Sequence, residues 1–143
     1  MRGRVPADGV AAQPNDQRTP MILVDTSVWI DHLRESDSTL VSLLETCDVL
    51  AHPLVTGELA MGTIRSRGEF LSLLGELPTA PVADHHEVLT LIETRGLHGT
   101  GLGIVDAHLL ASTLLAPGTT LWTRDRRLAE VAAHLNISWN GSP

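Results

Sequence analysis

Short apolar runs alternate with stretches of helical periodicity along most of the chain. The run MILV at 21–24 has no polar alternation, which is typical of a strand buried on both faces of a parallel sheet. Trp29, Ile30 and Leu33 then recur at helical spacing and predict a helix directly after this strand. Further strands are predicted at 48–52, 80–83, 119–123 and 137–139, of which 80–83 is the weakest.

Further helices are predicted between and after these strands, at 38–47, 53–61, 69–77, 86–95, 105–115 and 126–135. Pro53 suits the first turn of its helix, where the missing N–H does no harm. Strands that alternate with helices predict an α/β fold, here a three-layer sandwich with a central parallel sheet flanked by helices. Ligands bind just beyond the carboxyl ends of the strands in such a sheet, so that edge is the place to look for chemistry.

Four acidic residues are expected to reach this edge. Asp25 ends the first strand, and Asp125 follows the strand at 119–123 after one arginine. Asp106 opens a helix after a glycine-rich loop, and Glu58 lies about one turn into the helix that follows the second strand. Each aspartate alone is explained equally well as a helix N-cap. Glu58 and Asp106, however, have mostly apolar or small neighbours and little polar helix face on which to be solvated.

Buried carboxylates that gather in one place need a counter-charge, because they repel one another and are costly to desolvate. Mg²⁺ or Mn²⁺ would meet this need, since hard oxygen ligands hold such ions and leave positions open for water and phosphate. The ion would also lower the pKa of a bound water. Three hydroxyl residues near the acids would orient a carboxylate or a water, or equally serve local turns and caps: Thr26, Ser27 and Thr123.

Composition removes several classes of function. The 143 residues suit one domain, with 43% apolar residues and a formal net charge of −7. No lysine is present, which excludes a P-loop or a Schiff-base lysine. The single Cys47 excludes an internal disulfide and suits the reducing cytoplasm. Two local groups of arginines, interpreted either as RNA contacts or as solvated helix ends, interrupt the acidic background: Arg65 and Arg67, then Arg124, Arg126 and Arg127.

The first twenty residues, 1–20, differ in composition from the rest. They are rich in Pro, Gly, Ala and small polar residues without periodicity, which predicts a disordered extension or a mis-assigned start, with a functional domain at 21–143. They also lack the apolar core of a secretory signal.

The glycine-rich segment GTGLGIVD suggests a second class, a nucleotide-binding oxidoreductase. Two features oppose it. No clear strand precedes the loop, and Asp106 stands where the third glycine of a dinucleotide fingerprint would be, so its charge would repel a pyrophosphate. The glycines are better explained by a sharp turn before the Asp106 helix.

Four segments together resemble the acidic motifs of PIN-domain ribonucleases, and more narrowly the VapC-like toxins of VapBC toxin–antitoxin modules. They are ILVDTSVWID with Asp25, GELAMG with Glu58, GIVDAHLLA with Asp106, and LWTRDRRL with Asp125. Each motif alone is weak, whereas the ordered set from Met21 to about Trp139 is strong.

The resemblance implies a parallel sheet flanked by helices and a type II toxin that acts as a Mg²⁺- or Mn²⁺-dependent endoribonuclease. It further implies that Asp25, Glu58, Asp106 and Asp125 are catalytic metal ligands, that the protein is a homodimer, and that a small antitoxin places residues near the acids. A catalytically silent PIN-like binding module is the alternative, which an incomplete acidic set would indicate; the set here is complete.

Overall fold

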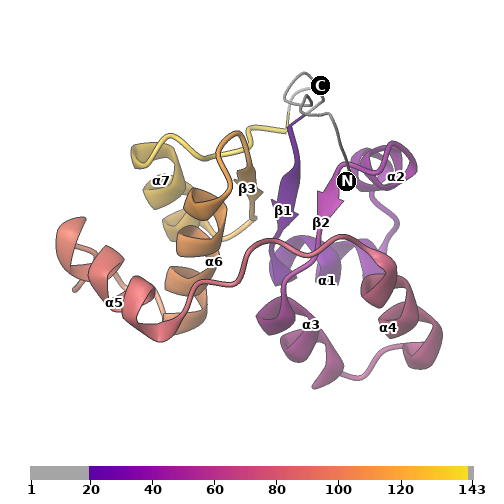
Figure 1. The fold of residues 1–143 in the computed structure, drawn as a ribbon. Coiled ribbons are helices and arrows are strands. Elements are labelled where there is room, and N and C mark those ends of the chain that lie inside the picture. The colour runs from indigo at the N-terminus through magenta and orange to yellow at the C-terminus, as the bar shows by residue number, and fades with distance from the viewer. Residues whose placement is uncertain (1–19, 142–143) are drawn as a thin grey trace, which may run out of the picture.

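Three parallel strands form the sheet at the centre of the computed structural model, which describes residues 20–141 (Figure 1). The strands are β1 (Ile22–Val24), β2 (Val49–Leu50) and β3 (Thr120–Trp122), in the order β2-β1-β3. The predicted N-terminal extension lies outside the described residues except for Pro20. Because β1 is the central strand, its residues are all buried, which accounts for the unbroken apolar run in the sequence.

In place of two of the predicted strands, the structure has single parallel bridges, one just before 80–83 and one within 137–139. Thr79 pairs with Ala51 beyond β2, and Ser138 pairs with Leu121 of β3. The prediction of a strand at 80–83 is therefore wrong: Pro81 has no N–H for a ladder and Val82 is 55% exposed. The prediction of a strand at 137–139 was likewise too long. These bridges still extend the parallel pairing by one position at each edge of the sheet.

All of the predicted helices are present: α1 (Thr26–Arg34), α2 (Ser38–Glu45), α3 (Pro53–Ala60), α4 (Arg67–Glu76), α5 (His85–Thr94), α6 (Ile104–Leu115) and α7 (Arg126–His134). Figure 1 shows α1 to α4 on the side of the molecule that carries β2, and α5 to α7 on the side that carries β3, with α5 packed on α6. The predicted α/β class, a parallel sheet flanked by helices, is thus confirmed. Within 20–141, no helix is both long and apolar enough to cross a membrane.

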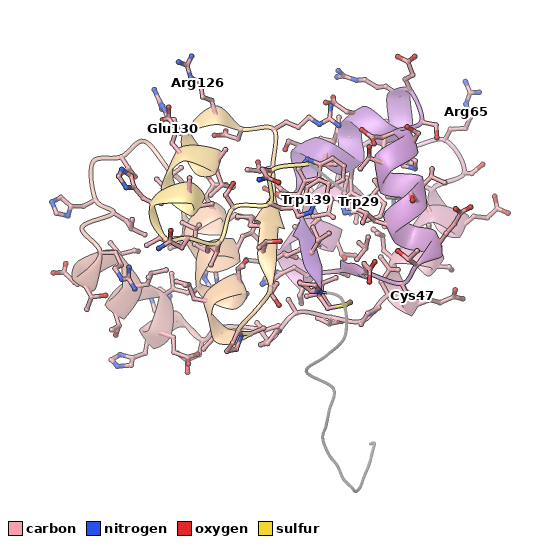
Figure 2. All side chains as sticks on the ribbon, turned by 90° about the horizontal axis from the view of Figure 1, so that it is seen from above. Trp29, Cys47, Arg65, Arg126, Glu130 and Trp139 are labelled. Carbon is pink, nitrogen blue, oxygen red and sulfur yellow. The ribbon has the colours of Figure 1, made fainter. Side chains whose placement is uncertain are left out.

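Aromatic residues pack close to the sheet on either side of it. Trp29 of α1 is fully buried and meets Phe70 of α4 edge to face, with ring centroids 5.7 Å apart. Trp122 of β3 contacts Trp139, with ring centroids 4.5 Å apart. In Figure 2, Trp29 and Trp139 lie toward the middle of the molecule, whereas Arg65 and Arg126 extend from its edge. Burial of these rings contributes much of the packing that holds the helices against the strands.

His52 is a buried polar link between α3 and α6. Its Nδ1 accepts a hydrogen bond from Leu54 N at 3.1 Å and so caps α3, while its Nε2 lies 3.0 Å from Ser112 Oγ of α6. Burial, with a smaller contribution from nearby His108, lowers the pKa of His52 below its usual range. The neutral imidazole therefore joins the helix that carries Glu58 to the helix that carries Asp106.

We predict that this histidine makes stability depend on pH. Because its pKa is lowered in the folded state, the unfolded chain binds the proton more readily, and stability falls as the pH drops below the ordinary histidine value of about 6.5. His52→Asn retains a capping side chain but does not titrate. The urea midpoint of the variant should change less than that of the parent between about pH 7.5 and about pH 5.5. Equal changes in both proteins would contradict the prediction.

Candidate active site

Asp25 directly follows the central strand and caps α1. Its side chain is nearly buried, with the residue only 7% exposed. The Oδ2 atom accepts hydrogen bonds from Ser27 Oγ at 2.7 Å and from Thr123 Oγ1 at 2.8 Å. These hydroxyls come from α1 and from the residue after β3, so Asp25 is held from two separate elements.

The residues after β3 complete this arrangement. The backbone N–H of Arg124 donates to Ser27 Oγ at 2.9 Å, and that of Asp125 donates to Thr123 Oγ1 at 3.0 Å. Asp125 in turn caps α7, since its Oδ1 accepts from Leu128 N at 3.0 Å. The capping explanation for Asp25 and Asp125 is therefore correct, and it leaves one oxygen of each carboxylate for another role.

Glu58 and Asp106 reach the same edge from α3 and α6. Glu58 is exposed, and its Oε1 accepts from Thr26 Oγ1 at 2.6 Å. Asp106 is half-buried in the first turn of α6, where its Oδ2 accepts from Gly103 N at 3.2 Å. Thr26, Ser27 and Thr123 thus each donate to a carboxylate, and Ser27 and Thr123 also take part in the local cap and turn hydrogen bonds that were the other interpretation.

The pKa of Asp106 is affected by its burial and by the charges of the other three acids. Burial is the largest influence and raises the pKa of Asp106, although the hydrogen bond from Gly103 opposes it. The charges of Asp25, Asp125 and Glu58 raise this pKa further. Carboxylates interact in this way only at short range, so the fold brings together residues that the sequence spreads over a hundred positions.

The donor set fits a hard divalent cation in its chemistry. Each of the four carboxylates has one oxygen in a hydrogen bond from a hydroxyl or a backbone N–H, and none forms an ion pair with a residue of 20–141. Among the residues that the structure describes, no cation therefore pairs with this negative charge. No group of three His, Cys, Asp or Glu side chains in that range is close enough to be a preformed ligand cage. The four acids reach the same edge of the sheet, but no three of their side chains are close enough together in this structure to hold a metal ion.

The glycine-rich loop at 96–103 has no strand before it, because α5 precedes it. Gly96, Gly99 and Gly101 have φ angles of 61°, 75° and 89°, which a residue with a side chain rarely adopts. Arg127 lies across Gly101 so closely that an added Cβ would be 2.4 Å from its guanidinium. The loop is a tight turn before α6, as predicted, and lacks the context of a dinucleotide site.

The five arginines predicted to contact RNA differ in the contacts that they make. Arg67 is engaged in capping α3, where it donates to Ala60 O at 2.9 Å, and Arg124 is paired with Asp31 and Asp37. Arg126 is highly exposed and lies 3.9 Å from Glu130. Among the predicted arginines, Arg65 is the one that lines a groove together with an acid of the site.

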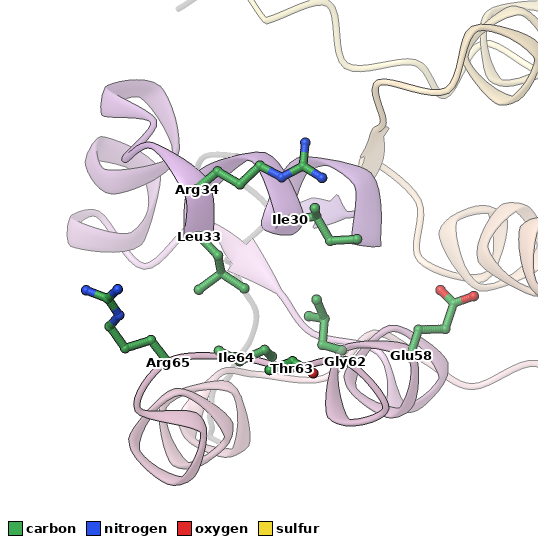
Figure 3. Close-up of a pocket in the computed structure, with 9 residues that line it drawn as sticks. Ile30, Leu33, Arg34, Glu58, Gly62, Thr63, Ile64 and Arg65 are labelled. Carbon is green, nitrogen blue, oxygen red and sulfur yellow. The ribbon is translucent and has the colours of Figure 1, made fainter.

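This groove, with a volume of about 340 Å³, has Glu58 at one end and runs between α1 and the segment after α3 (Figure 3). Ile30, Leu33 and Ile64 give it an apolar lining, and Arg34 and Arg65 border it. Sequence reasoning missed Arg34. A signal was available, because Arg34 follows Ile30 by four residues and so shares its face of α1.

A parallel sheet with a cluster of acids at its carboxyl edge defines a known class. The PIN domain family model matches residues 22–134, and the chain belongs to the PIN-domain family. It is similar to Ribonuclease VapC32 of Mycobacterium tuberculosis strain CDC 1551 / Oshkosh, with 52% identity over 118 residues, 82% of this chain and 95% of the relative. Ribonuclease VapC32 of strain ATCC 25618 / H37Rv matches with the same identity and coverage. The resemblance to VapC-like PIN-domain proteins is confirmed.

We predict that the pKa of Asp106 responds to its neighbours in metal-free protein. Asp25→Asn removes one of the charges that raise this pKa and should bring it down toward, but not to, its ordinary value, because burial remains. A carboxyl-carbon NMR titration in EDTA measures the change. Glu35→Gln, a loss of one negative charge at the end of α1, is the control, since Glu35 is not among the charges that act on Asp106. A pKa that is the same in both variants would show that Asp25 and Asp106 do not interact.

Proposed function

We propose that this protein is the toxin of a type II toxin–antitoxin system, a metal-dependent endoribonuclease that cleaves RNA phosphodiesters. The observation that carries the proposal is the convergence of Asp25, Glu58 and Asp125 on Asp106, with no ion pair from residues 20–141 to neutralise them. The similarity to a relative named as a ribonuclease supports the same class of substrate.

Asp25, Glu58, Asp106 and Asp125 would hold Mg²⁺, or Mn²⁺ in its place. A divalent ion bound there would lower the pKa of a water and offset the charge of the attacked phosphate during in-line displacement. The chain's own contribution is orientation. Ser27 and Thr123 hold Asp25 through Oδ2, and Thr26 holds Glu58 through Oε1, so each carboxylate presents its other oxygen.

RNA is proposed to enter along the groove beside Glu58. Arg34 and Arg65 are exposed and have no ion pair or hydrogen bond with the described residues, so their charges are available to phosphates. Arg67 and Arg124 are already engaged, which leaves them a smaller part in substrate binding than the sequence suggested. The unpaired charges of Arg34 and Arg65 would allow a protein with a net charge of −7 to bind RNA locally.

The partners proposed for this chain are a second copy of itself and a small VapB-like antitoxin. An uncompensated acidic cluster is a natural target for an antitoxin arginine, because a guanidinium pairs well with carboxylates. Occupation of the site by such a residue would exclude both metal and RNA. We propose that the toxin acts in the cytoplasm, where RNA is made.

We predict that Asp25→Asn and Asp106→Asn each lower RNA cleavage by about 100-fold or more, because each removes a carboxylate that would hold the metal ion on which transition-state stabilisation depends. Asp84→Asn is the matched control: Asp84 also caps a helix, and asparagine keeps a cap while removing the charge. Antitoxin-free protein is incubated with total RNA and Mg²⁺ or Mn²⁺. Cleavage that persists in EDTA, or in both site variants, would refute the metal–carboxylate mechanism, and RNA binding without cleavage would favour the silent module.

We predict that Arg34→Gln and Arg65→Gln each weaken RNA binding and reduce the slope of log K against log salt by about 0.7, the value for one phosphate contact on a single strand. Binding is measured by fluorescence anisotropy with the Asp106→Asn protein, so that the RNA stays intact. Arg95→Gln removes the same charge from the end of α5 and should leave the slope unchanged. A groove that does not bind RNA would give the parental slope in all three variants.

A further inference from the structure

Arg124 lies between two residues of the site, Thr123 and Asp125, and is attached to α1 at two points. Its backbone N–H donates to Ser27 Oγ at 2.9 Å, and Ser27 Oγ also binds Asp25. Its guanidinium reaches past the site to the region where α1 ends and α2 begins. The segment after β3 is therefore bound to α1 through both the main chain and the side chain of one residue.

The guanidinium has three neighbours that fix its direction. Nη1 of Arg124 lies 3.2 Å from Asp31 Oδ2, and Nη2 of Arg124 donates to Asp37 Oδ2. The group also lies over the ring of Trp122, 5.8 Å from its centroid. The Arg124 side chain is 40% exposed, and its guanidinium already contacts two carboxylates and the ring of Trp122. Such a group is poorly placed to release its contacts for an RNA phosphate.

Asp37 is a firm anchor for this contact. Its Oδ1 caps α2 by accepting from Leu40 N at 3.0 Å, and its own N–H donates to His32 Nδ1 at 3.0 Å. The Leu40 N–H is the largest influence on the pKa of Asp37 and lowers it, and Arg124 lowers it further against the effect of burial. Asp37 therefore remains charged at neutral pH and cannot rotate without loss of the cap.

We propose that Arg124 is a positioning residue of the metal site: its ion pairs with Asp31 and Asp37 hold the segment from Thr123 to Asp125 against α1. This inference rests on the proposed function. Exposed ion pairs add little to global stability, so the contact acts mainly on local geometry. Thr123, Ser27 and Asp25 share hydrogen bonds, and a displacement of this segment would move both Asp125 and the hydroxyl that orients Asp25.

The test uses Mn²⁺ alone as the probe, titrated calorimetrically into the metal-free, full-length protein. Loss of Arg124 alone would also change the local charge, so the informative variant is Asp37→Asn with Arg124→Met, which removes one positive and one negative charge. Asparagine keeps the cap of α2. The Kd for Mn²⁺ should rise by about 10-fold, as for other partners that orient metal ligands, while the thermal midpoint changes little.

Two further variants separate positioning from general effects. Arg124→Lys retains the charge and can pair with one carboxylate, so its Kd should lie between those of the parent and the double variant. Arg95→Met removes an arginine distant from these contacts and should leave the Kd unchanged. An Mn²⁺ affinity in the double variant equal to that of the parent, or an equal loss in Arg95→Met, would overturn the inference.

Failure of the inference is distinguishable from failure of the proposed function. If the parent binds no Mn²⁺, or Asp106→Asn binds it equally well, the metal site itself is absent and both fall. If the parent binds and only the double variant is unchanged, the positioning role alone is refuted.

Should the double variant not fold, Asp31→Asn removes one of the two ion pairs. Glu35→Gln, an equal change of charge at the end of α1, is then its control, and equal Kd values in these two variants would overturn the inference.

Discussion

The structure depends on the hydrogen bonds that Asp25 accepts from Ser27 and Thr123 at the end of the central strand. A carboxylate that is only 7% exposed would be costly without partners, and these hydroxyls satisfy one oxygen without supplying positive charge. They also connect the residue after β3 to the first turn of α1. The same contacts therefore bind the segment after β3 to α1 and orient an acid of the site.

Around this edge of the sheet, the acids of the site and the arginine beside them bind different partners. The four acids accept hydrogen bonds from hydroxyls and backbone N–H groups, while the guanidinium of Arg124, the residue before Asp125, pairs with Asp31 and Asp37 instead. Burial raises the pKa of Asp106, and the charges of Asp25, Asp125 and Glu58 raise it further. A site of this kind favours a cation from solution, and the same property makes it open to an inhibitory arginine from a partner.

Much of the fold followed from periodicity, because long amphipathic segments carry a strong local signal. The helices were all predicted, and Asp84, Asp25 and Asp125 are caps as local rules require. The errors fall on short segments at the sheet edges: 80–83 forms no strand and follows a single bridge at Thr79, and 137–139 forms one bridge, at Ser138. A few apolar residues specify no pairing partner, and Pro81 cannot donate to a ladder.

The sequence by itself determined which residues carry charge, where each strand ends, and in what order the acids occur. It did not determine which arginines are free. Arg124 and Arg65 look alike along the chain, yet one is held by acids from α1 and the start of α2 and the other borders a groove beside Glu58. Only the tertiary structure decides this, because an ion pair depends on distances between elements that no local pattern encodes.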